Sequence, residues 1–169
     1  MTLKLLTGNE ALALGALRAG VKVATGYPGT PSTGCIESLL LLQPPGVHVE
    51  WSANEKVAFE IASGAAWAGQ RALCTMKMSG VNVAYDSITS IAYSGVVGGM
   101  VIYVADDPGV SAGMCEQDTR MFALMSDLPL LDAASVEDAY RLVQAGFEIS
   151  ERVGTPVFVR LVTSISSSF

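Results

Sequence analysis

Charged side chains are scarce in this chain, and the basic ones among them are scattered. Only 15% of the 169 residues are charged, and the formal net charge is −6. Nucleic-acid-binding surfaces depend on clustered Lys and Arg side chains, so this composition argues against a nucleic-acid partner. No apolar run approaches the roughly 18 residues that a membrane-spanning helix requires. Glu10 and Arg18 interrupt the first apolar positions, so we see no clean signal peptide and expect a cytoplasmic protein.

Cysteine and histidine are also rare, and their spacing does not suit a metal site. Cys35, Cys74 and Cys115 lie about 40 residues apart, with no C-x-x-C pair. Zinc and iron–sulfur ligands cluster in short motifs, so we expect no metal bound by this chain. Disulfides are rare in the cytoplasm, which favours buried or incidental thiols. The single histidine, His48, is predicted to be structural, with a partner nearby in the sequence.

The rest of the chain alternates between strand-like and helix-like segments. Half of the residues are hydrophobic, enough for a large core in one domain that spans residues 1–169. Strands separated by helices indicate βαβ units, so the predicted fold is α/β, a mostly parallel sheet between two helical layers. The expected strands are residues 21–26, 47–51, 72–76, 100–105, 130–131 and 157–162, with helices between them.

Four segments of this predicted fold share one edge of the sheet. They are residues 27–34, 52–55, 77–82 and 106–117, and each follows a predicted strand. Open α/β sheets bind their ligands at the carboxyl ends of the strands. The same four segments are the richest in polar residues and glycine. We therefore expect the functional site at this edge.

Glu55 is the sharpest candidate for a catalytic group. It follows Asn54 at the start of a predicted helix, and small residues at 62–66 would let that helix pack closely on another backbone. A carboxylate near a helix N-terminus in an apolar wall is suited to share a proton with a ring nitrogen. The simpler explanation is that acidic residues favour the first turn of any helix through its dipole. Position alone does not decide between the two.

A set of short segments carries a resemblance to a known family. NEKVAFEIASGAA (54–66) resembles the N-E-x(8)-G-x-A segment of thiamine-diphosphate enzymes. The other segments occur in the family's order: LTGNEA (6–11), GYPGTPS (26–32), MK (76–77), GVNVA (80–84), VADDPG (104–109) and EQDTR (116–120). Together they resemble the N-terminal, pyrimidine-binding domain of the indolepyruvate:ferredoxin oxidoreductase large subunit, in the 2-oxoacid:ferredoxin oxidoreductase superfamily. The resemblance covers nearly the whole chain and implies the thiamine-diphosphate-binding fold, pyrimidine type.

The resemblance also implies roles for residues at the predicted edge. The family's glutamate hydrogen-bonds N1′ of the cofactor's aminopyrimidine, which makes Glu55 the implied catalytic residue. The threonine of the Y-P-x-T-P-S segment, here Thr30, would approach the substrate carboxylate; a plain turn closing a βα unit is the alternative. Lys77 ends a strand and is suited to attract an anion, or is an ordinary strand-end charge. The other implied contacts are Tyr27, Pro28 and Asn82 with the cofactor, and Met78 and Asp106 with the substrate.

Two departures from the family pattern concern histidine. Related enzymes read M-K-H-x-G where this chain has MKMSG at 76–80, and the later loop lacks the histidine that follows P-G-x. A different acid, or a partner, would then perform any task of those histidines. Met78, Met114 and Met121 suit a bulky apolar or aromatic substrate, although core filling is the ordinary role of a methionine.

One half of the cofactor site is missing from the sequence. The family binds Mg²⁺ and the diphosphate with a G-D-G segment followed by Asn-Asn, and the chain contains neither. The resemblance therefore implies thiamine diphosphate shared with a diphosphate-binding subunit or domain, and iron–sulfur clusters on a further partner. We expect helices 54–69 and 79–93 to form the interface, where a charge at Ala65 or Ala66 should block assembly.

Three functions remain open at this point. The first is oxidative decarboxylation of an aryl or bulky 2-oxo acid to an acyl-CoA, with electrons passed to ferredoxin-type clusters on partners. The second is the alpha subunit of a non-oxidative 2-oxoacid decarboxylase, which would need no cluster-bearing partner. The third is a catalytically silent scaffold, which the presence of Glu55 disfavours.

Overall fold

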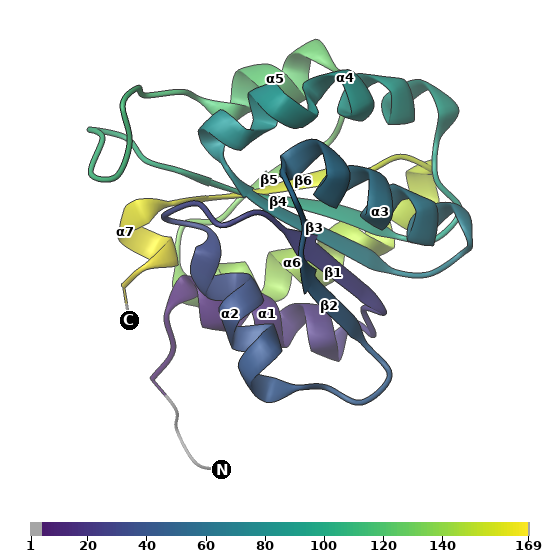
Figure 1. Ribbon diagram of the computed structural model, residues 1–169, viewed down its shortest axis with the longest axis horizontal. Helices are drawn as coiled ribbons and strands as arrows, with labels where there is room; N and C mark the ends of the chain where they lie inside the picture. The colour runs from purple at the N-terminus through teal and green to yellow at the C-terminus, as the bar shows by residue number, and fades with distance from the viewer. Residues whose placement is uncertain (1–4, 169) are drawn as a thin grey trace.

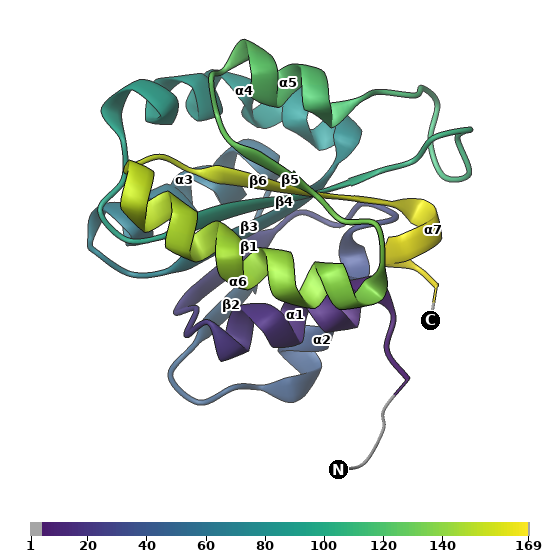
Figure 2. The ribbon, with the colours of Figure 1, turned by 180° about the vertical axis from the view of Figure 1, so that it is seen from behind.

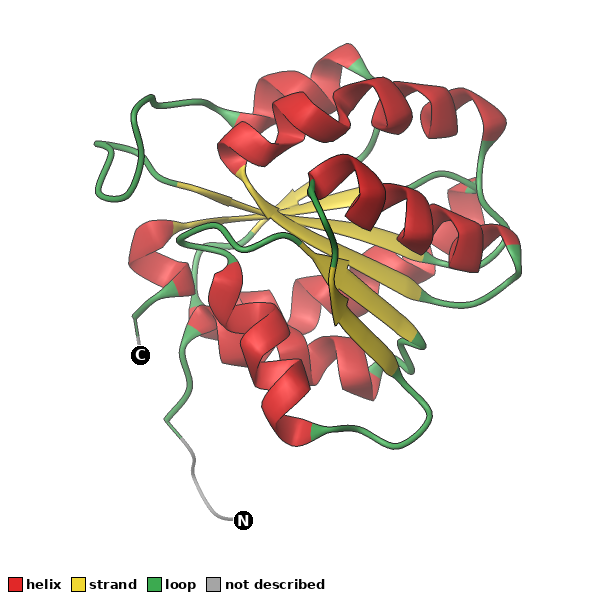
Figure 3. Ribbon diagram, in the orientation of Figure 1, coloured by secondary structure: helices red, strands yellow, loops and turns green. Residues whose placement is uncertain are grey.

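A parallel sheet of six strands forms the centre of the molecule (Figures 1 and 3). The computed structural model describes residues 5–168. The strands lie in the order β2-β1-β3-β4-β6-β5, and every neighbouring pair is parallel. The strands are β1 (Val23–Gly26), β2 (His48–Trp51), β3 (Ala72–Lys77), β4 (Met100–Asp106), β5 (Leu130–Asp132) and β6 (Val157–Val162).

Helices cover both faces of the sheet. The first face carries α1 (Gly8–Arg18), α2 (Thr33–Leu42) and α6 (Val136–Val153), which lies in front of the sheet in Figure 2. The second face carries α3 (Glu55–Trp67), α4 (Met78–Ser94) and α5 (Thr119–Met125); α4 and α5 are at the top of Figure 1, and α3 lies below them. The predicted three-layer α/β fold is therefore confirmed. No helix within residues 5–168 combines the length and the apolar character needed to cross a membrane.

The core consists of two hydrophobic clusters, one on each side of the sheet. Leu73 and Tyr103 belong to the cluster under α1, α2 and α6, whereas Cys74 and Ile102 belong to the cluster under α3 and α4. Successive side chains of a strand point to opposite faces, so a sheet covered on both faces has no polar face. Accordingly, all residues of β4 are buried.

The predicted elements start and end within two residues of the observed ones. One helix was not predicted: α7 (Thr163–Ser166), which follows β6 directly. Four residues are too few to show a helical period, so the pattern of apolar positions could not reveal it. No residue separates β3 from α4, because α4 begins at Met78 immediately after Lys77.

The order of the strands reverses at one place on the carboxyl edge, between β1 and β3, and we refer to this point of reversal as the crevice. The chain leaves β1 for β2 on one side and then returns to place β3 on the other side of β1. Parallel sheets bind ligands where the strand order reverses in this way. The loop after β1 and the start of α4 flank this point, and the four polar segments all follow parallel strands at the same edge. The four polar segments therefore lie at one edge of the sheet, where the site is expected.

Candidate active site

Glu55 is a buried carboxylate at the start of α3. Its helix is capped by Asn54, whose side-chain oxygen accepts a hydrogen bond of 2.9 Å from the Val57 N–H. Glu55 itself is only 8% exposed. Its carboxylate lies against the first turn of α4, where a Cβ added to Gly80 would stand 2.6 Å from Glu55 Oε1. Two helices from different βαβ units therefore fix the position of this side chain.

The immediate surroundings of Glu55 supply no competing donor. Among residues 5–168, no side-chain hydrogen bond involves its carboxylate, and the nearby Thr25 hydroxyl donates to the Ala58 carbonyl instead, at 2.6 Å. Burial raises the pKa of the Cys74 thiol to about 12, and the Glu55 charge adds to the shift. Cys74 is therefore a neutral thiol beneath the carboxylate. The carboxylate oxygens of Glu55 can therefore accept a hydrogen bond from a ligand that binds at the sheet edge.

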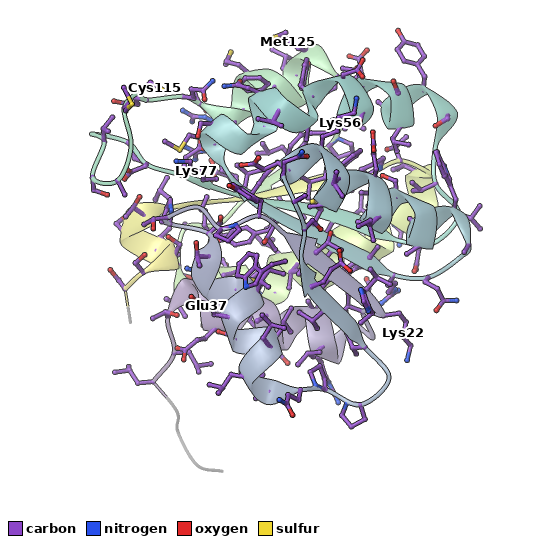
Figure 4. The ribbon with its side chains drawn as sticks, in the orientation of Figure 1. Lys22, Glu37, Lys56, Lys77, Cys115 and Met125 are labelled. Carbon is purple, nitrogen blue, oxygen red and sulfur yellow. The ribbon has the colours of Figure 1, made fainter. Side chains whose placement is uncertain are left out.

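Lys77 brings a positive charge to the same crevice. It is the last residue of β3 and the residue before α4, and its side chain is half-buried (Figure 4). Its stem lies over Gly29, where an added Cβ would stand 3.1 Å from Lys77 Cγ and Cδ. No acidic side chain within the described residues forms an ion pair with it. The N-terminus of α4 carries no side-chain cap, so the helix dipole adds positive potential there.

The loop between β1 and α2 carries three further predicted contacts. Tyr27 is 40% exposed, and Pro28 and Thr30 are exposed as well. The loop is held from below by Asn9, whose amide donates to the Pro31 carbonyl at 2.8 Å. The Asn9 carbonyl oxygen accepts a 2.8 Å bond from the buried Tyr103 hydroxyl, so the loop is linked to β4 through the core.

Thr30 faces a cavity that Glu55 does not line. This cavity of about 550 Å³ lies on the side of α1, α2 and α7, whereas Glu55 belongs to the side of α3 and α4. Two acidic residues, Glu10 and Glu37, line it together with several hydroxyl groups. The structure thus does not bring Thr30 and Glu55 together in one cavity. Sequence reasoning missed Asn9 and the cavity, because both depend on contacts between α1 and segments distant in sequence.

Asn82 and Met78 project from the first turns of α4 in different directions. Asn82 is exposed and pairs with Gln117, with amide nitrogen to amide oxygen distances of 3.0 Å in both directions. Met78 is 1% exposed and belongs to the core; its Cε lies 3.8 Å from a Cβ built on Gly113 of the loop after β4. Asn82 therefore ties this loop to α4, and Met78 supports it from beneath.

Asp106 ends β4 as part of a buried charge network. It is 1% exposed and accepts hydrogen bonds from the Thr119 N–H at 3.0 Å, from the Thr119 hydroxyl and from Arg160 Nε at 2.6 Å. Arg160 in turn contacts Asp132 at 2.9 Å. Asp106 is therefore buried, with its carboxylate already bound by three donors of the protein. Arg160 was missed by sequence reasoning, although a single charge inside the apolar strand VFVRLV was a visible signal.

The neighbouring Asp107 closes the turn that follows β4. Its carboxylate accepts hydrogen bonds from the Ser111 N–H and hydroxyl, from the Ala112 N–H and from the Thr163 hydroxyl, all between 2.6 and 2.7 Å. The Ser111 and Thr163 hydroxyls and the backbone donors lower the pKa of Asp107 to about 2. The loop 107–118 is therefore fastened to α7 as well as to α4.

The hydrogen bonds to Asp107 favour its ionised carboxylate, so the order of loop 107–118 depends on pH in the acidic range. A carboxyl whose pKa falls from 3.8 to about 2 on folding stabilises the fold above pH 4, and the contribution is lost as the pH falls through 2. Thr163→Val removes one donor, so we expect the pKa of Asp107 to rise and the loop to loosen at a higher pH. A carboxyl-carbon NMR titration measures this; an unchanged Asp107 midpoint in the variant would contradict it.

The remaining rare residues form no further site. His48 Nε2 lies 2.7 Å from Glu50 Oε2, which gives it the local partner expected of a structural histidine. Cys35 and Cys74 are buried and Cys115 is exposed. Within residues 5–168, no three His, Cys, Asp or Glu side chains are grouped to hold a metal ion.

Comparisons with known proteins give this architecture a context. Residues 14–167 match the family described as pyruvate flavodoxin/ferredoxin oxidoreductase, thiamine diP-bdg. The chain is 44% identical over 163 residues to indolepyruvate oxidoreductase subunit IorA of Pyrococcus horikoshii, and 45% identical over 166 residues to IorA of Archaeoglobus fulgidus. The matches cover 96% and 95% of this chain but 25% and 27% of the relatives. The chain thus spans about a quarter of the length of these curated relatives.

A more distant relative and a solved structure extend the comparison. The 2-oxoglutarate synthase subunit KorA of Archaeoglobus fulgidus is 30% identical over 167 residues, which is 94% of this chain and 48% of that protein. The solved structure is a 2-oxoglutarate:ferredoxin oxidoreductase from Magnetococcus marinus with 2-oxoglutarate, coenzyme A and succinyl-CoA bound. It matches with a TM-score of 0.86 over 95% of this chain and 29% of its own, at 21% identity. At this identity the likeness establishes a shared fold.

Proposed function

Because this chain belongs to the thiamine-diphosphate-binding family of pyruvate flavodoxin/ferredoxin oxidoreductases, we propose that it is one component of a thiamine-diphosphate-dependent 2-oxoacid oxidoreductase. The reaction is the oxidative decarboxylation of an aryl or bulky 2-oxo acid to an acyl-CoA, with electrons passed to ferredoxin-type clusters on partners. The names of the IorA relatives support an aryl substrate. The observation that carries the proposal is the buried Glu55 side chain, whose carboxylate lies against the first turn of α4 and accepts no side-chain hydrogen bond among residues 5–168.

The residues around Glu55 fit the pyrimidine half of the cofactor. Thiamine diphosphate, when bound, supplies a carbon nucleophile and an electron sink for decarboxylation. Glu55 would hold the proton at the ring nitrogen N1′, since its carboxylate has no side-chain hydrogen-bond partner among residues 5–168 and rests against Gly80. Tyr27 and Pro28 are exposed on the loop after β1, and Asn82 is exposed on α4, where its amide pairs with Gln117.

Lys77 is the better-supported contact for the carboxylate of the substrate. Its ammonium group has no acidic partner within the described residues, and it lies beside the positive end of α4. Thr30, by contrast, faces a cavity whose Glu10 and Glu37 side chains would repel an anion. Met78 and Asp106 act indirectly, because both are buried and support the loop that forms the wall of the site.

The other half of the cofactor site belongs to a partner subunit or domain. That partner binds Mg²⁺ and the diphosphate, and a cluster-bearing partner receives the electrons. The exposed face of α3 and α4 is the proposed docking surface, because Glu55 lies at its edge and apolar side chains remain exposed on it. They are Ile61 (37% exposed), Trp67 (52%) and Val83 (49%), beside a groove of about 360 Å³ between the two helices.

Of the two residues that the sequence indicated for a test of this surface, Ala65 is half-buried and Ala66 is unsuitable. Ala66 is fully buried, so a charge there would disrupt the core and not an interface. We expect Val83→Asp to prevent assembly while leaving the fold intact, because a charge would be desolvated against the partner. Size-exclusion chromatography with light scattering measures assembly, and Arg141→Asp on the exposed surface of α6 is the control. Normal assembly of the Val83→Asp protein would exclude this surface.

The overall function is tested on the purified complex that contains this chain. Mass spectrometry should find bound thiamine diphosphate, and an aryl 2-oxo acid such as indolepyruvate should give an acyl-CoA while a ferredoxin-type acceptor is reduced. Release of an aldehyde without reduction of the acceptor would identify a non-oxidative decarboxylase instead. A complex that neither contains nor binds thiamine diphosphate would identify a scaffold.

A further inference from the structure

Gly80 touches the Glu55 carboxylate more closely than any side chain would allow. A Cβ built on Gly80 would stand 2.6 Å from Oε1, 2.7 Å from Cγ and 3.0 Å from Cδ of Glu55. Real Cβ atoms do not approach other heavy atoms to such distances. The first turn of α4 therefore accommodates the carboxyl group of Glu55 only because residue 80 has no side chain.

The helix itself gives no reason for a glycine at this position. Gly80 has ordinary helical geometry as the third residue of α4, where alanine would favour the helix. Glycine also weakens a helix end that carries no side-chain cap. Gly64 in α3 offers a comparison, because nothing lies within 4 Å of the Cβ that could be added there. Glycine at position 80 thus destabilises the helix, and the contact that its missing side chain permits is the one with Glu55.

We propose that Gly80 is a positioning residue, which sets the direction of the Glu55 carboxylate toward the crevice. The inference rests on the proposed role of Glu55 at the cofactor. A methyl group at residue 80 would occupy the space of the carboxyl group, and the flexible end of Glu55 is what would yield. Glu55 would then turn away from the ring nitrogen while the backbone of α4 stayed in place.

Gly80→Ala should therefore separate function from stability. Displacement of a reacting group by about 1 Å can cost on the order of 10²-fold in rate. We expect a loss of turnover of this size in the complete complex, together with weaker binding of thiamine diphosphate by calorimetry. The thermal midpoint should stay the same or rise, because alanine favours the helix. Thr89→Ala, a similar gain in helix propensity farther along α4, should leave turnover and cofactor affinity unchanged.

A double-mutant cycle shows whether Gly80 acts through Glu55. In a Glu55→Ala background there is no carboxyl group to displace, so Gly80→Ala should change cofactor affinity and residual turnover by less than about twofold. An equal loss in both backgrounds, or unchanged kinetics of Gly80→Ala alone, would overturn the positioning role. If Glu55→Ala itself keeps normal turnover and affinity, the proposed function of Glu55 fails, and the role of Gly80 fails with it.

Discussion

Glu55→Gln should abolish most of the turnover of the complete enzyme while leaving its assembly and stability unchanged. Glutamine keeps the shape of the side chain and its contact with Gly80, but it cannot exchange a proton with a ring nitrogen. Acid–base groups of this kind contribute about 10²- to 10⁴-fold to a rate. We expect a fall in kcat within this range, measured by acyl-CoA formation under saturating substrate.

The matched control is Glu148→Gln, an exposed carboxylate on α6 at the opposite face of the sheet. It removes the same charge from the same chain, so it separates an effect at the site from a change in overall electrostatics. Wild-type kcat in the Glu55→Gln protein would remove the central support for the proposed mechanism. An equal loss in both variants would point to net charge instead.

Arg160→Met should destabilise the fold strongly. The Arg160 side chain is 10% exposed and binds Asp106, which is 1% exposed, so its removal leaves a buried carboxylate without its cation. Breaking a buried pair in this way costs about 3–5 kcal/mol, because the remaining charge is uncompensated. Asp132 loses its cation as well. Equilibrium unfolding in urea measures the change in the free energy of unfolding.

Arg141→Met provides the comparison for this experiment. Arg141 lies on the surface of α6 and pairs with Glu137 at 3.9 Å, with both side chains more than 60% exposed. Exposed pairs between neighbouring helical turns contribute about 0.5 kcal/mol or less, so this variant should unfold almost like the wild type. A loss below about 1 kcal/mol for Arg160→Met would mean that the network relaxes or admits water, and that Asp106 is not held as we describe.

The secondary structure was predictable because local patterns determine it. Asn54 caps α3 and Ser135 caps α6 with the side-chain hydrogen bonds that their residue types suggest. The long buried strand β4 reads as an unbroken apolar run, as expected when both faces of a sheet are covered. The four-residue helix α7 carries no such pattern, and its position depends on the Asp107 and Thr163 contact.

The gathering of the candidate site residues at one edge was also predictable, since parallel strands bring their carboxyl ends to one edge. Glu55 and Lys77 could be placed there from their position after strands β2 and β3. The direction in which each side chain points could not be predicted from the sequence. Thr30 turns toward α1 and α2, Met78 enters the core, and Asp106 is held by Arg160.

The sequence by itself determined the α/β fold, the polar edge and the candidate carboxylate, because hydrophobic periodicity and residue order are local properties of the chain. Only the tertiary structure decided which residues meet. The contact of Gly80 with Glu55 joins two helices, and the pairing of Asn82 with Gln117 joins a helix to a loop. Such contacts depend on the distance between backbones after packing, and no spacing within one segment encodes that distance.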